Sequence, residues 1–303
     1  MTAVKINNVV KTYGKKKEIT ALSDISFSVS KGELFGIIGP DGAGKTSLFR
    51  ILTTLLLADN GNVTVDGFDV VKDYKAIRQR VGYMPGRFSL YQDLSVKENL
   101  NFFATIFNTS VEENYELIKD IYSQIEPFKD RKAGKLSGGM KQKLALSCAL
   151  IHRPSVLFLD EPTTGVDAVS RKEFWEMLKR LKEQGITILV STPYMDEASM
   201  CDRVALIQAG KILSINTPQG IVETFGKKLL AVKSTDMLRL LHDLKQCEEV
   251  QDAYPFGEYH HAVMRNDSKE LLRSYLEQRG QSFELKEAEP NIEDCFMALM
   301  KTS

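Results

Sequence analysis

The sequence lacks a net charge, paired cysteines and any long apolar run. Its 40 basic and 40 acidic side chains cancel, so the charge balance does not favour a phosphate backbone, and we expect no nucleic-acid partner. Its four cysteines form no C-x-x-C pair and have no histidine at metal-site spacing, which predicts reduced, buried thiols. No window approaches the roughly 20 continuous apolar residues that span a bilayer, and the start "MTAVKINNVV" has no apolar core of a signal peptide. We therefore expect a soluble, cytoplasmic chain.

What is present is the composition of a folded protein with a sizeable core. Of its 303 residues, 43% are apolar and 26% are charged, and the length predicts two domains at roughly 100 to 200 residues each. The run "GELFGIIG" is apolar almost throughout, as is typical of a strand buried on both faces. The segment "AGKTSLFRILTTLL" that follows has helical spacing, with one apolar face made of Leu48, Ile51, Leu52 and Leu55.

The middle of the chain is helical in pattern and then alternates between strand and helix. Ser95 precedes Glu98 at the spacing of a capping box and lies near the start of a helical subdomain predicted over about residues 90–150. The runs "SVLFLDE" and "ITILVST" are typical of strands, and Ser170 with Glu173 can cap the helix between them. Strands that alternate with helices predict an α/β fold with a mostly parallel core sheet.

The pattern changes again near residue 225. From there the sequence reads as strand, helix, two strands, helix and strand, followed by a last short helix. This order predicts a small ferredoxin-like α+β unit. We expect one domain over residues 1–224 and a C-terminal accessory domain over residues 225–303.

The strongest motif is "GPDGAGKTS", which matches G-x-x-x-x-G-K-[ST] and lies between a predicted strand and a predicted helix. Its glycines let consecutive backbone N–H groups face a phosphate, because no Cβ blocks the approach. Lys45 adds a positive charge for the terminal phosphates, Thr46 offers a hydroxyl to Mg²⁺, and the helix N-terminus adds its dipole. A glycine-rich turn that only joins strand to helix is the alternative. The predicted ATP-binding residues of this phosphate loop are Gly39, Pro40, Asp41, Gly42, Ala43, Gly44, Lys45, Thr46 and Ser47.

A second candidate site lies in "VLFLDEP", where Asp160 and Glu161 leave the end of an apolar strand. Ligands of α/β proteins bind at this edge of the sheet. Asp160 can hold the Mg²⁺ shell, and Glu161 can orient and deprotonate an attacking water. Two adjacent carboxylates at a strand end can also be only a helix cap or a solvated turn, an interpretation that the nearby phosphate loop weakens.

The segment "LSGGMKQKLALSCALIH" begins with Ser-Gly-Gly at a helix start and ends just before the acidic strand. Here the chain resembles the nucleotide-binding subunits of ATP-binding cassette (ABC) transporters, over residues 1 to about 220. "LSGGM" matches their L-S-G-G-Q signature with methionine for glutamine, and "GPDGAGKT", "VLFLDEP" and "TTGVD" match three further motifs in order. The resemblance implies a P-loop NTPase of ABC type, with an N-terminal antiparallel β subdomain, a mostly parallel core sheet and a helical subdomain.

The resemblance also implies that two subunits enclose two ATP molecules, each bound by the phosphate loop of one subunit and the signature of the other. Ser137, Gly138 and Gly139 would then form an anion site at a helix N-terminus. A glycine pair capped by serine can also be only a helix start. Asp167 would belong to the loop at the dimer interface, and Tyr13 would stack on adenine, with surface packing as its alternative.

The ending "EPNIEDCFMALM" is similar to the E-P-S-L-E-D-V-F closure of bacterial ABC-2 type exporters of the daunorubicin-resistance kind. An amphipathic end helix after a proline is the alternative. The similarity implies an export subunit at the cytoplasmic face of the membrane. Its partners would be a separate ABC-2 type transmembrane subunit and a second ABC subunit, identical or different. A nucleotide-sensing regulatory module and a soluble ABC ATPase without a transport role are the competing functions.

Two positions depart from the family pattern. Gly86 stands where the resemblance calls for a glutamine that reaches Mg²⁺ and water, and Pro193 in "STPYMDEA" replaces a histidine that contacts the γ-phosphate. Proline has no side-chain donor or acceptor and no backbone N–H. Thr192 should face the opposite side of an extended strand, and Ser191 lies about 6.6 Å back from Pro193 along it. Neither residue is an obvious substitute for the histidine. We therefore expect a chain that binds Mg-ATP and dimerises, but whose own site either hydrolyses ATP slowly or is helped by groups that the sequence does not reveal.

Overall fold

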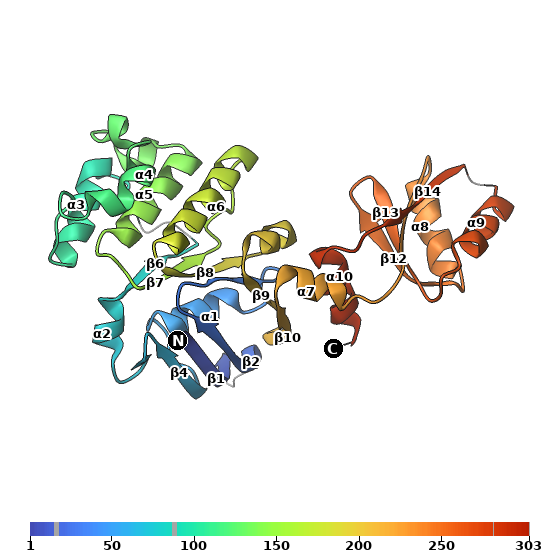
Figure 1. Ribbon diagram of the computed structural model, residues 1–303, viewed down its shortest axis with the longest axis horizontal. Helices are drawn as coiled ribbons and strands as arrows, with labels where there is room; N and C mark the ends of the chain where they lie inside the picture. Colours follow the sequence, from blue (N-terminus) through green and yellow to red (C-terminus); the bar gives the residue numbers. More distant parts are fainter. Residues whose placement is uncertain (15–17, 87–89, 281, 303) are drawn as a thin grey trace. The chain divides into compact units, whose positions relative to one another are not determined.

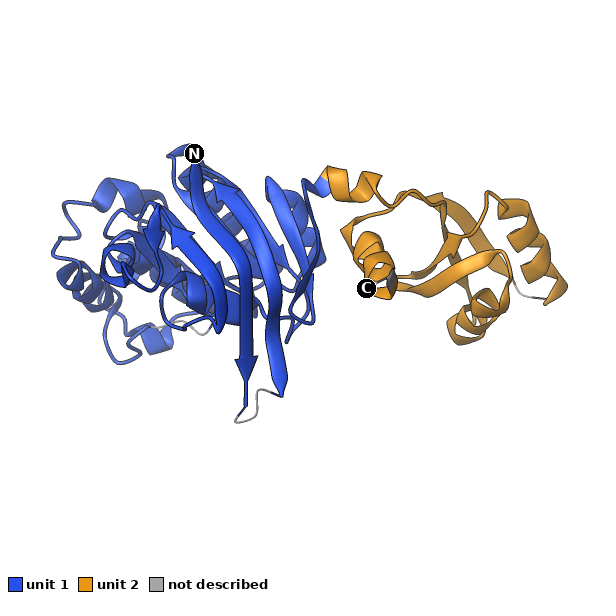
Figure 2. Ribbon diagram, turned by 90° about the horizontal axis from the view of Figure 1, so that it is seen from below, with its two compact units in different colours: residues 1–218, 303 blue, residues 219–302 orange. Residues whose placement is uncertain are grey.

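The structure, a computed structural model, describes residues 1–14, 18–86, 90–280 and 282–302. These residues form two compact units, residues 1–218 and 219–302 (Figure 2). The first unit contains all of the predicted nucleotide-binding residues, and most of its helices and strands are labelled in Figure 1. In the described parts of the chain, no helix is both long enough and apolar enough to cross a membrane.

An antiparallel sheet opens the first unit, as predicted. Its strands follow the order β2-β1-β4-β5. From Ile25 to Ser30, β2 alternates strictly between buried and exposed residues, because only one face of this sheet packs on the core. The strands are β1 (Thr2–Tyr13), β2 (Ile19–Ser30), β4 (Asn60–Val65) and β5 (Phe68–Asp69).

A six-stranded sheet forms the centre of the unit and confirms the predicted, mostly parallel core. Five strands are parallel, in the order β9-β3-β8-β7-β6, and β10 pairs antiparallel with β9 at the edge. Three strands, β3, β7 and β8, are buried along their whole length, which explains their unbroken apolar runs. The strands are β3 (Leu34–Ile38), β6 (Val81–Met84), β7 (Val156–Asp160), β8 (Thr187–Thr192), β9 (Arg203–Gln208) and β10 (Lys211–Asn216).

Helices surround this sheet, and α3, α4 and α5 lie together in the predicted helical subdomain (Figure 1). Ser95 caps α3 in a complete capping box with Glu98, as its spacing predicts. The helices are α1 (Lys45–Leu52), α2 (Tyr74–Arg78), α3 (Val96–Ile106), α4 (Tyr115–Tyr122), α5 (Gly138–Leu150) and α6 (Ala168–Glu183), with the 3-10 helices η1 (Glu126–Phe128), η2 (Ala133–Lys135) and η3 (Met195–Met200).

The predicted apolar face of α1 is one turn too long. The helix ends at Leu52, because Thr54 has a left-handed φ of 62° through which an α-helix does not continue. Leu55 therefore lies outside the helix and is 57% exposed.

The predicted cap of α6 is wrong. The helix begins at Ala168, because the Asp167 carboxylate accepts hydrogen bonds from the backbone N–H groups of Val169 and Ser170. Ser170 thus lies in the first turn of the helix and does not cap it.

One hydrophobic core joins the antiparallel sheet, α1 and the central sheet. Phe49 of α1 packs edge-on against Phe158 of β7, with ring centroids 5.9 Å apart. Burial of a side chain of this size contributes about 2–3 kcal/mol. The helix that begins at the phosphate loop is thereby fixed against the strand that ends in Asp160.

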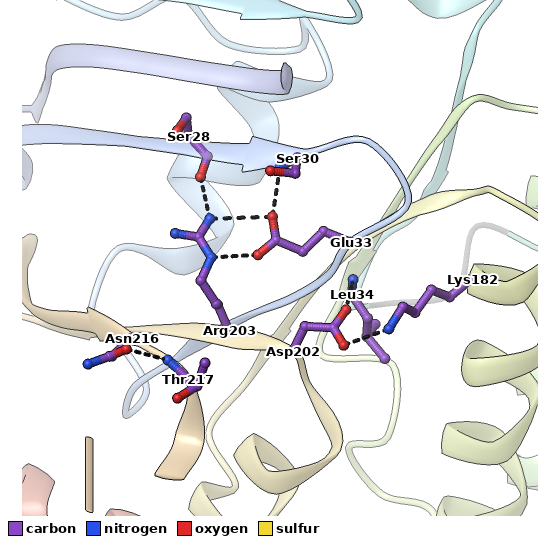
Figure 3. Close-up of polar contacts among 9 residues, drawn as sticks. All are labelled: Ser28, Ser30, Glu33, Leu34, Lys182, Asp202, Arg203, Asn216 and Thr217. Carbon is purple, nitrogen blue, oxygen red and sulfur yellow. Dashed lines mark hydrogen bonds and ion pairs between the residues drawn. The ribbon is translucent and has the colours of Figure 1, made fainter. Parts of the chain in front are cut away.

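Polar contacts join β2 and β9 next to the start of β3 (Figure 3). Arg203 donates to both oxygens of Glu33, with Nε–Oε1 at 2.6 Å and Nη2–Oε2 at 3.3 Å, and to the carbonyl of Ser28 at 2.8 Å. Ser30 N donates to the same carboxylate at 2.6 Å. Glu33 is buried, so these contacts supply the partners that a buried carboxylate requires. They fix β3 at the end opposite the phosphate loop.

The second unit has the predicted order of elements and confirms the ferredoxin-like α+β fold. Its antiparallel sheet follows the order β12-β13-β11-β14, and α8 and α9 pack on one face around buried leucines such as Leu230, Leu244 and Leu272. The first unit ends at Pro218, shortly before the domain boundary expected at residue 224. The elements are α7 (Pro218–Glu223), β11 (Leu229–Ser234), α8 (Met237–Gln246), β12 (Val250–Phe256), β13 (Tyr259–Met264), α9 (Lys269–Gln278), β14 (Phe283–Ala288) and α10 (Ile292–Thr302).

Asp294 holds α10 on this sheet. Its Oδ1 accepts from Tyr254 Oη at 2.8 Å and from His261 Nδ1 at 2.7 Å, and its Oδ2 accepts from Asn291 N at 2.9 Å. Burial alone would raise the pKa of Asp294, but the hydrogen bonds from His261, Asn291 and Tyr254 outweigh burial and lower the pKa. The ionised carboxylate therefore stabilises the folded unit.

Candidate functional site

The phosphate loop joins β3 to α1 and is pressed against neighbouring backbone. A Cβ at Gly39 would lie 2.2 Å from Ile207 O, and a Cβ at Gly44, whose φ is +106°, would lie 2.3 Å from Ala21 O. Only glycine fits these two positions. Gly39 N also donates to the carbonyl of Thr192, at the end of β8, at 3.2 Å. These contacts fix a loop whose backbone is bare of side chains where a phosphate would approach.

Lys45 closes the phosphate loop from inside. The residue is 3% exposed, and its Nζ donates to the carbonyl oxygens of Gly39 at 2.8 Å and Pro40 at 3.0 Å. The same nitrogen lies 3.1 Å from Glu161 Oε1. A buried ammonium needs such partners, because an unpaired charge in the interior is costly. The structure thus brings two of the predicted site residues, Lys45 and Glu161, into one ion pair.

Asp160 is the last residue of β7, Glu161 follows it, and both are held by Ser191 of the neighbouring strand β8. Ser191 Oγ donates to Asp160 Oδ1 at 2.6 Å, and Glu161 N donates to both Ser191 Oγ at 3.1 Å and Ser191 O at 3.0 Å. Glu161 has a φ of +50°, a left-handed conformation that costs a residue other than glycine about 1–2 kcal/mol. The hydrogen bonds to Ser191 maintain this turn, which brings the Glu161 carboxylate to Lys45.

Two tyrosines border the site. Tyr13 ends β1, and its hydroxyl lies 3.0 Å from Ser47 Oγ in the first turn of α1, which brings the predicted adenine-stacking residue to the phosphate loop. Tyr83 of β6 lies near Asp160. Burial and then the charge of Asp160 raise the pKa of Tyr83 to about 12, while Arg50 opposes the shift. Tyr83 is therefore a neutral phenol at physiological pH.

A pocket of about 190 Å³ opens on the phosphate loop. In the described part of the chain, no three His, Cys, Asp or Glu side chains are arranged to hold a metal by themselves. Mg²⁺ commonly takes one or two protein oxygens and completes its shell with substrate phosphates and water. The Thr46 hydroxyl and the Asp160 carboxylate fit that mode, so these residues fit Mg²⁺ bound together with a nucleotide. The pocket is lined by Ala21, Gly42, Gly44, Lys45, Thr46, Ser47 and Glu161.

The predicted signature residues lie at the start of α5, beside the turn that precedes α6. Ser137 caps α5, and its Oγ accepts from Met140 N at 3.3 Å. A Cβ at Gly139 would lie 2.8 Å from Ser170 Oγ, so the two helix starts are in close contact. Hydrogen bonds from Ser170 lower the pKa of Asp167, the cap of α6. Ser137 and Asp167 are both exposed, so this surface of the chain is available to a partner.

The sequence did not indicate a role for two residues that contact the acidic turn, residues 160–162. One is Ser191, which contacts both acidic residues although it cannot replace a histidine. The other is Gln142 of α5, which is fully buried and donates from Nε2 to the carbonyl of Pro162 at 2.7 Å. Ser191 is a polar residue in the apolar run "ITILVST", and because a buried polar side chain requires a partner, its polarity was an available signal. Gln142 stands between Lys141 and Lys143, so its polarity did not mark it in the sequence.

Of the two departures from the family pattern, Gly86 borders the acidic turn and Pro193 follows the strand whose Ser191 holds that turn. Gly86 follows β6, and a Cβ there would lie 3.2 Å from the carbonyl of Asp160. Pro193 comes directly after β8, where the next residue turns the chain: Tyr194 N donates to Thr192 Oγ1 at 3.1 Å. Neither glycine nor proline has a polar side-chain atom. Gly86 beside Asp160 and Pro193 at the end of β8 therefore give the site no further side-chain donor.

Known proteins similar to this chain are ATP-binding subunits of transporters. The family model described as ABC transporter matches residues 22–164. The Nod factor export ATP-binding protein I of Rhizobium sp. (strain N33) is 33% identical over 304 residues, which cover 98% of this chain and 96% of that protein. The doxorubicin resistance ATP-binding protein DrrA of Mycobacterium tuberculosis (strain CDC 1551 / Oshkosh) is 34% identical over 274 residues, which cover 89% of this chain and 80% of that protein.

A longer relative and a solved structure agree with these matches. The probable multidrug ABC transporter ATP-binding protein YbhF of Escherichia coli (strain K12) is 37% identical over 284 residues, which cover 92% of this chain but 49% of YbhF. The chain thus spans about half the length of that relative. A dimeric post-hydrolysis structure of the ATP-binding cassette MJ0796, bound to ADP and Pi, has 27% identity and a TM-score of 0.64, covering 71% of this chain and 98% of that one. The first unit therefore has the fold of an ABC-type P-loop NTPase, as predicted.

Proposed function

The chain belongs to the family of ABC transporter ATP-binding proteins, and from this premise we propose that it is the ATP-binding and hydrolysing subunit of an ABC-2 type membrane exporter. The observation that carries the proposal is the convergence of the phosphate loop, Lys45 and Glu161 around one pocket, with Asp160 beside Glu161 and held by the same serine, Ser191. Export is supported by the relatives, which are named for multidrug transport, Nod factor export and doxorubicin resistance.

Each residue of the site has a role that its position supports. The backbone of the phosphate loop and Lys45 would hold the phosphates of ATP, and Tyr13 would stack on the adenine. Thr46 and Asp160 would hold Mg²⁺, which when bound neutralises charge on the terminal phosphates. Glu161 would orient the attacking water and accept its proton.

The ion pair between Lys45 and Glu161 suggests how ATP binding prepares this site. A phosphate in the loop competes for the Lys45 ammonium, because it brings several negative charges to the same nitrogen. Once Lys45 contacts the phosphate, the Glu161 carboxylate is released and can act on water. Binding of the nucleotide and release of the base are thus one exchange of partners.

The proposal includes a second ABC subunit. Ser137, Gly138 and Asp167 are exposed at the starts of α5 and α6, where Ser137 offers a hydroxyl and the helix N-terminus offers backbone N–H groups. We propose that Ser137, Gly138 and Gly139 bind the γ-phosphate of ATP held by the partner, and that Asp167 lies at the dimer interface. An identical and a different partner both satisfy this arrangement.

An apolar groove supports a transmembrane subunit as the other partner. It has a volume of about 380 Å³ and lies between the end of β6 at Met84 and the helices α3 and α5, where Phe103 and Phe107 line it. Leu55 and Ile106, at the same groove, are 57% and 54% exposed. Exposed apolar surface of this kind marks protein contacts. A cytoplasmic helix of a membrane-spanning chain would fit here and hold this chain at the cytoplasmic face.

We further propose that the chain's own site hydrolyses ATP slowly. Gly86 beside Asp160 and Pro193 directly after β8 offer no side-chain donor, and the loss of one positioned donor or acid–base group typically costs about 10² to 10⁴ in rate. Lys45 and Glu161 are retained, so hydrolysis is weakened and not abolished. The same observation favours one second candidate, a module that senses nucleotide and turns it over negligibly.

The experiment measures ATP binding and phosphate release by the purified chain, alone and with a co-expressed multi-span membrane partner. We expect ATP binding that Lys45→Ala abolishes, and turnover that the membrane partner stimulates. ATP-dependent dimerisation with no turnover, even with that partner, would favour the sensing module. Full turnover without any membrane partner would favour a soluble ATPase. A wild-type chain that binds no ATP would contradict all three.

A further inference from the structure

Ser191 lies at the centre of the acidic part of the site and has no role in the mechanism above. It is fully buried in β8 and is paired with Asp160 of β7 in the parallel register of the two strands. Its hydroxyl contacts Asp160 Oδ1 at 2.6 Å and Glu161 N at 3.1 Å. One side chain therefore touches both acidic residues of the site.

Chemistry fixes the directions of these two hydrogen bonds. A backbone N–H group can only donate, so Ser191 Oγ is the acceptor of the bond from Glu161. The hydroxyl proton is then available for Asp160 Oδ1, and the 2.6 Å separation is typical of a hydroxyl that donates to a carboxylate. Ser191 O accepts from the same Glu161 N at 3.0 Å, so both the backbone and the side chain of Ser191 hold this turn.

We propose that Ser191 is a positioning residue of the metal–nucleotide site, which orients the Asp160 carboxylate for Mg²⁺ and holds Glu161 in its left-handed turn. This inference rests on the proposed function. A hydrogen bond to Oδ1 restrains rotation of the carboxylate, so the remaining oxygen is presented in one direction. Hydrogen bonds of this kind to metal-binding carboxylates orient the ligand and tune its affinity.

The departures at Gly86 and Pro193 make the contribution of Ser191 larger. Gly86 borders the acidic turn and Pro193 directly follows β8, and neither offers a side-chain hydroxyl, amide or imidazole. Ser191 lies in β8, which ends at Thr192 just before Pro193, and its side chain contacts the acidic residues from within the sheet. Strand β8 therefore still positions the acidic turn although no histidine follows it.

A buried serine can also serve stability alone, by satisfying the polar groups around it. The two roles differ in a measurable way, because a purely structural role does not change how much Mg²⁺ strengthens ATP binding. Thr187 provides a matched control. It is a buried hydroxyl at the opposite end of the same strand, where it accepts a hydrogen bond from Gly32 N at 3.0 Å.

The test compares the full wild-type chain with S191A, S191C and T187V. For each, the dissociation constant of a fluorescent ATP analogue is measured with Mg²⁺ and with EDTA. The constant in EDTA divided by the constant with Mg²⁺ gives the factor by which the metal strengthens binding. The electron paramagnetic resonance spectrum of Mn²⁺ bound with ATP gives a second readout of the metal's surroundings. S191C keeps the shape of the side chain with a somewhat larger terminal atom and offers only a weak donor, so it remains informative where S191A does not fold.

We expect the ratio to fall about 10- to 100-fold in S191A and S191C, as happens when other metal sites lose a hydrogen-bond partner of a ligand. The Mn²⁺ spectrum should change in the same variants, and T187V should keep the wild-type ratio and spectrum. An unchanged ratio and spectrum in the Ser191 variants would overturn the inference and leave the proposed function standing. A wild-type chain that does not bind the analogue would overturn the proposed function and this inference with it.

Discussion

The ion pair between Lys45 and Glu161 leads to a quantitative prediction for Glu161→Gln. Two unit charges 3.1 Å apart attract each other by about 5 kcal/mol at an effective dielectric constant of about 20. Most of this attraction is offset by desolvation and by solvent screening, since the Glu161 side chain is 23% exposed. We take about 1 kcal/mol as the net strength of the pair.

Because ATP must displace Glu161 from Lys45, removing the carboxylate charge should strengthen ATP binding by this amount. A change of about 1 kcal/mol corresponds to about a fivefold lower dissociation constant, measured by calorimetry with ATP. Hydrolysis should fall by about 10² to 10⁴ in a phosphate-release assay, since the glutamine amide cannot accept the proton of water. One substitution thus improves binding and impairs turnover.

Glu173→Gln is the matched control for this prediction. Glu173 pairs with Lys143 at 2.9 Å in a contact between α6 and α5, so its substitution should alter neither ATP binding nor hydrolysis. Equal or weaker ATP binding by E161Q, with E173Q at the wild-type value, would refute the competition between Glu161 and the phosphates for Lys45.

Three further substitutions test other parts of the chain. Pro193→His should raise hydrolysis at least about tenfold in the phosphate-release assay, and an unchanged rate would show that the missing imidazole is not limiting. Arg203→Ala leaves the buried Glu33 without its charged partner and should lower the free energy of unfolding, measured in urea, by about 2 kcal/mol. This loss is smaller than for a fully buried ion pair, because Arg203 is partly exposed. Asp294→Asn should lower the free energy of unfolding at pH 7 by about 1–3 kcal/mol. The folded pKa of Asp294 lies below its unfolded value, so the wild type loses this stability as the pH falls through the folded pKa. The difference in stability between wild type and D294N should therefore shrink below about pH 4. Circular dichroism melts that show the same difference at every pH would contradict this account.

Features with strong local chemistry could be predicted from the sequence. The glycines and Lys45 of the phosphate loop, the capping box at Ser95 and the unbroken apolar runs of β3, β7 and β8 all depend on residues that are close together in the chain. The order of strands and helices after residue 225 is of the same kind. Such features leave few alternative structures, and the fold follows from them.

Contacts between distant segments could not be predicted in this way. The spacing within "ITILVST" does not show that β8 pairs with β7 in the register that puts Ser191 opposite Asp160. Asp167 and Ser170 are both good helix caps, and the helix begins at the aspartate, while Ser170 packs against Gly139 of the neighbouring helix start. Helix ends and polar partners of this kind are decided by tertiary packing, which a single sequence does not display.

The position of β8 between β3 and β7 explains why one strand contacts both halves of the site. The carbonyl of Thr192 accepts from Gly39 N in the phosphate loop, and the preceding residue, Ser191, contacts Asp160 and Glu161. Two consecutive residues of one buried strand therefore connect the phosphate loop to the acidic turn. The proline that follows has no polar side-chain atom to offer a γ-phosphate, but it leaves this connection intact, because the connection uses the backbone of Thr192 and the hydroxyl of Ser191. For this reason we expect ATP binding and its dependence on Mg²⁺ to persist in this chain while hydrolysis is slowed.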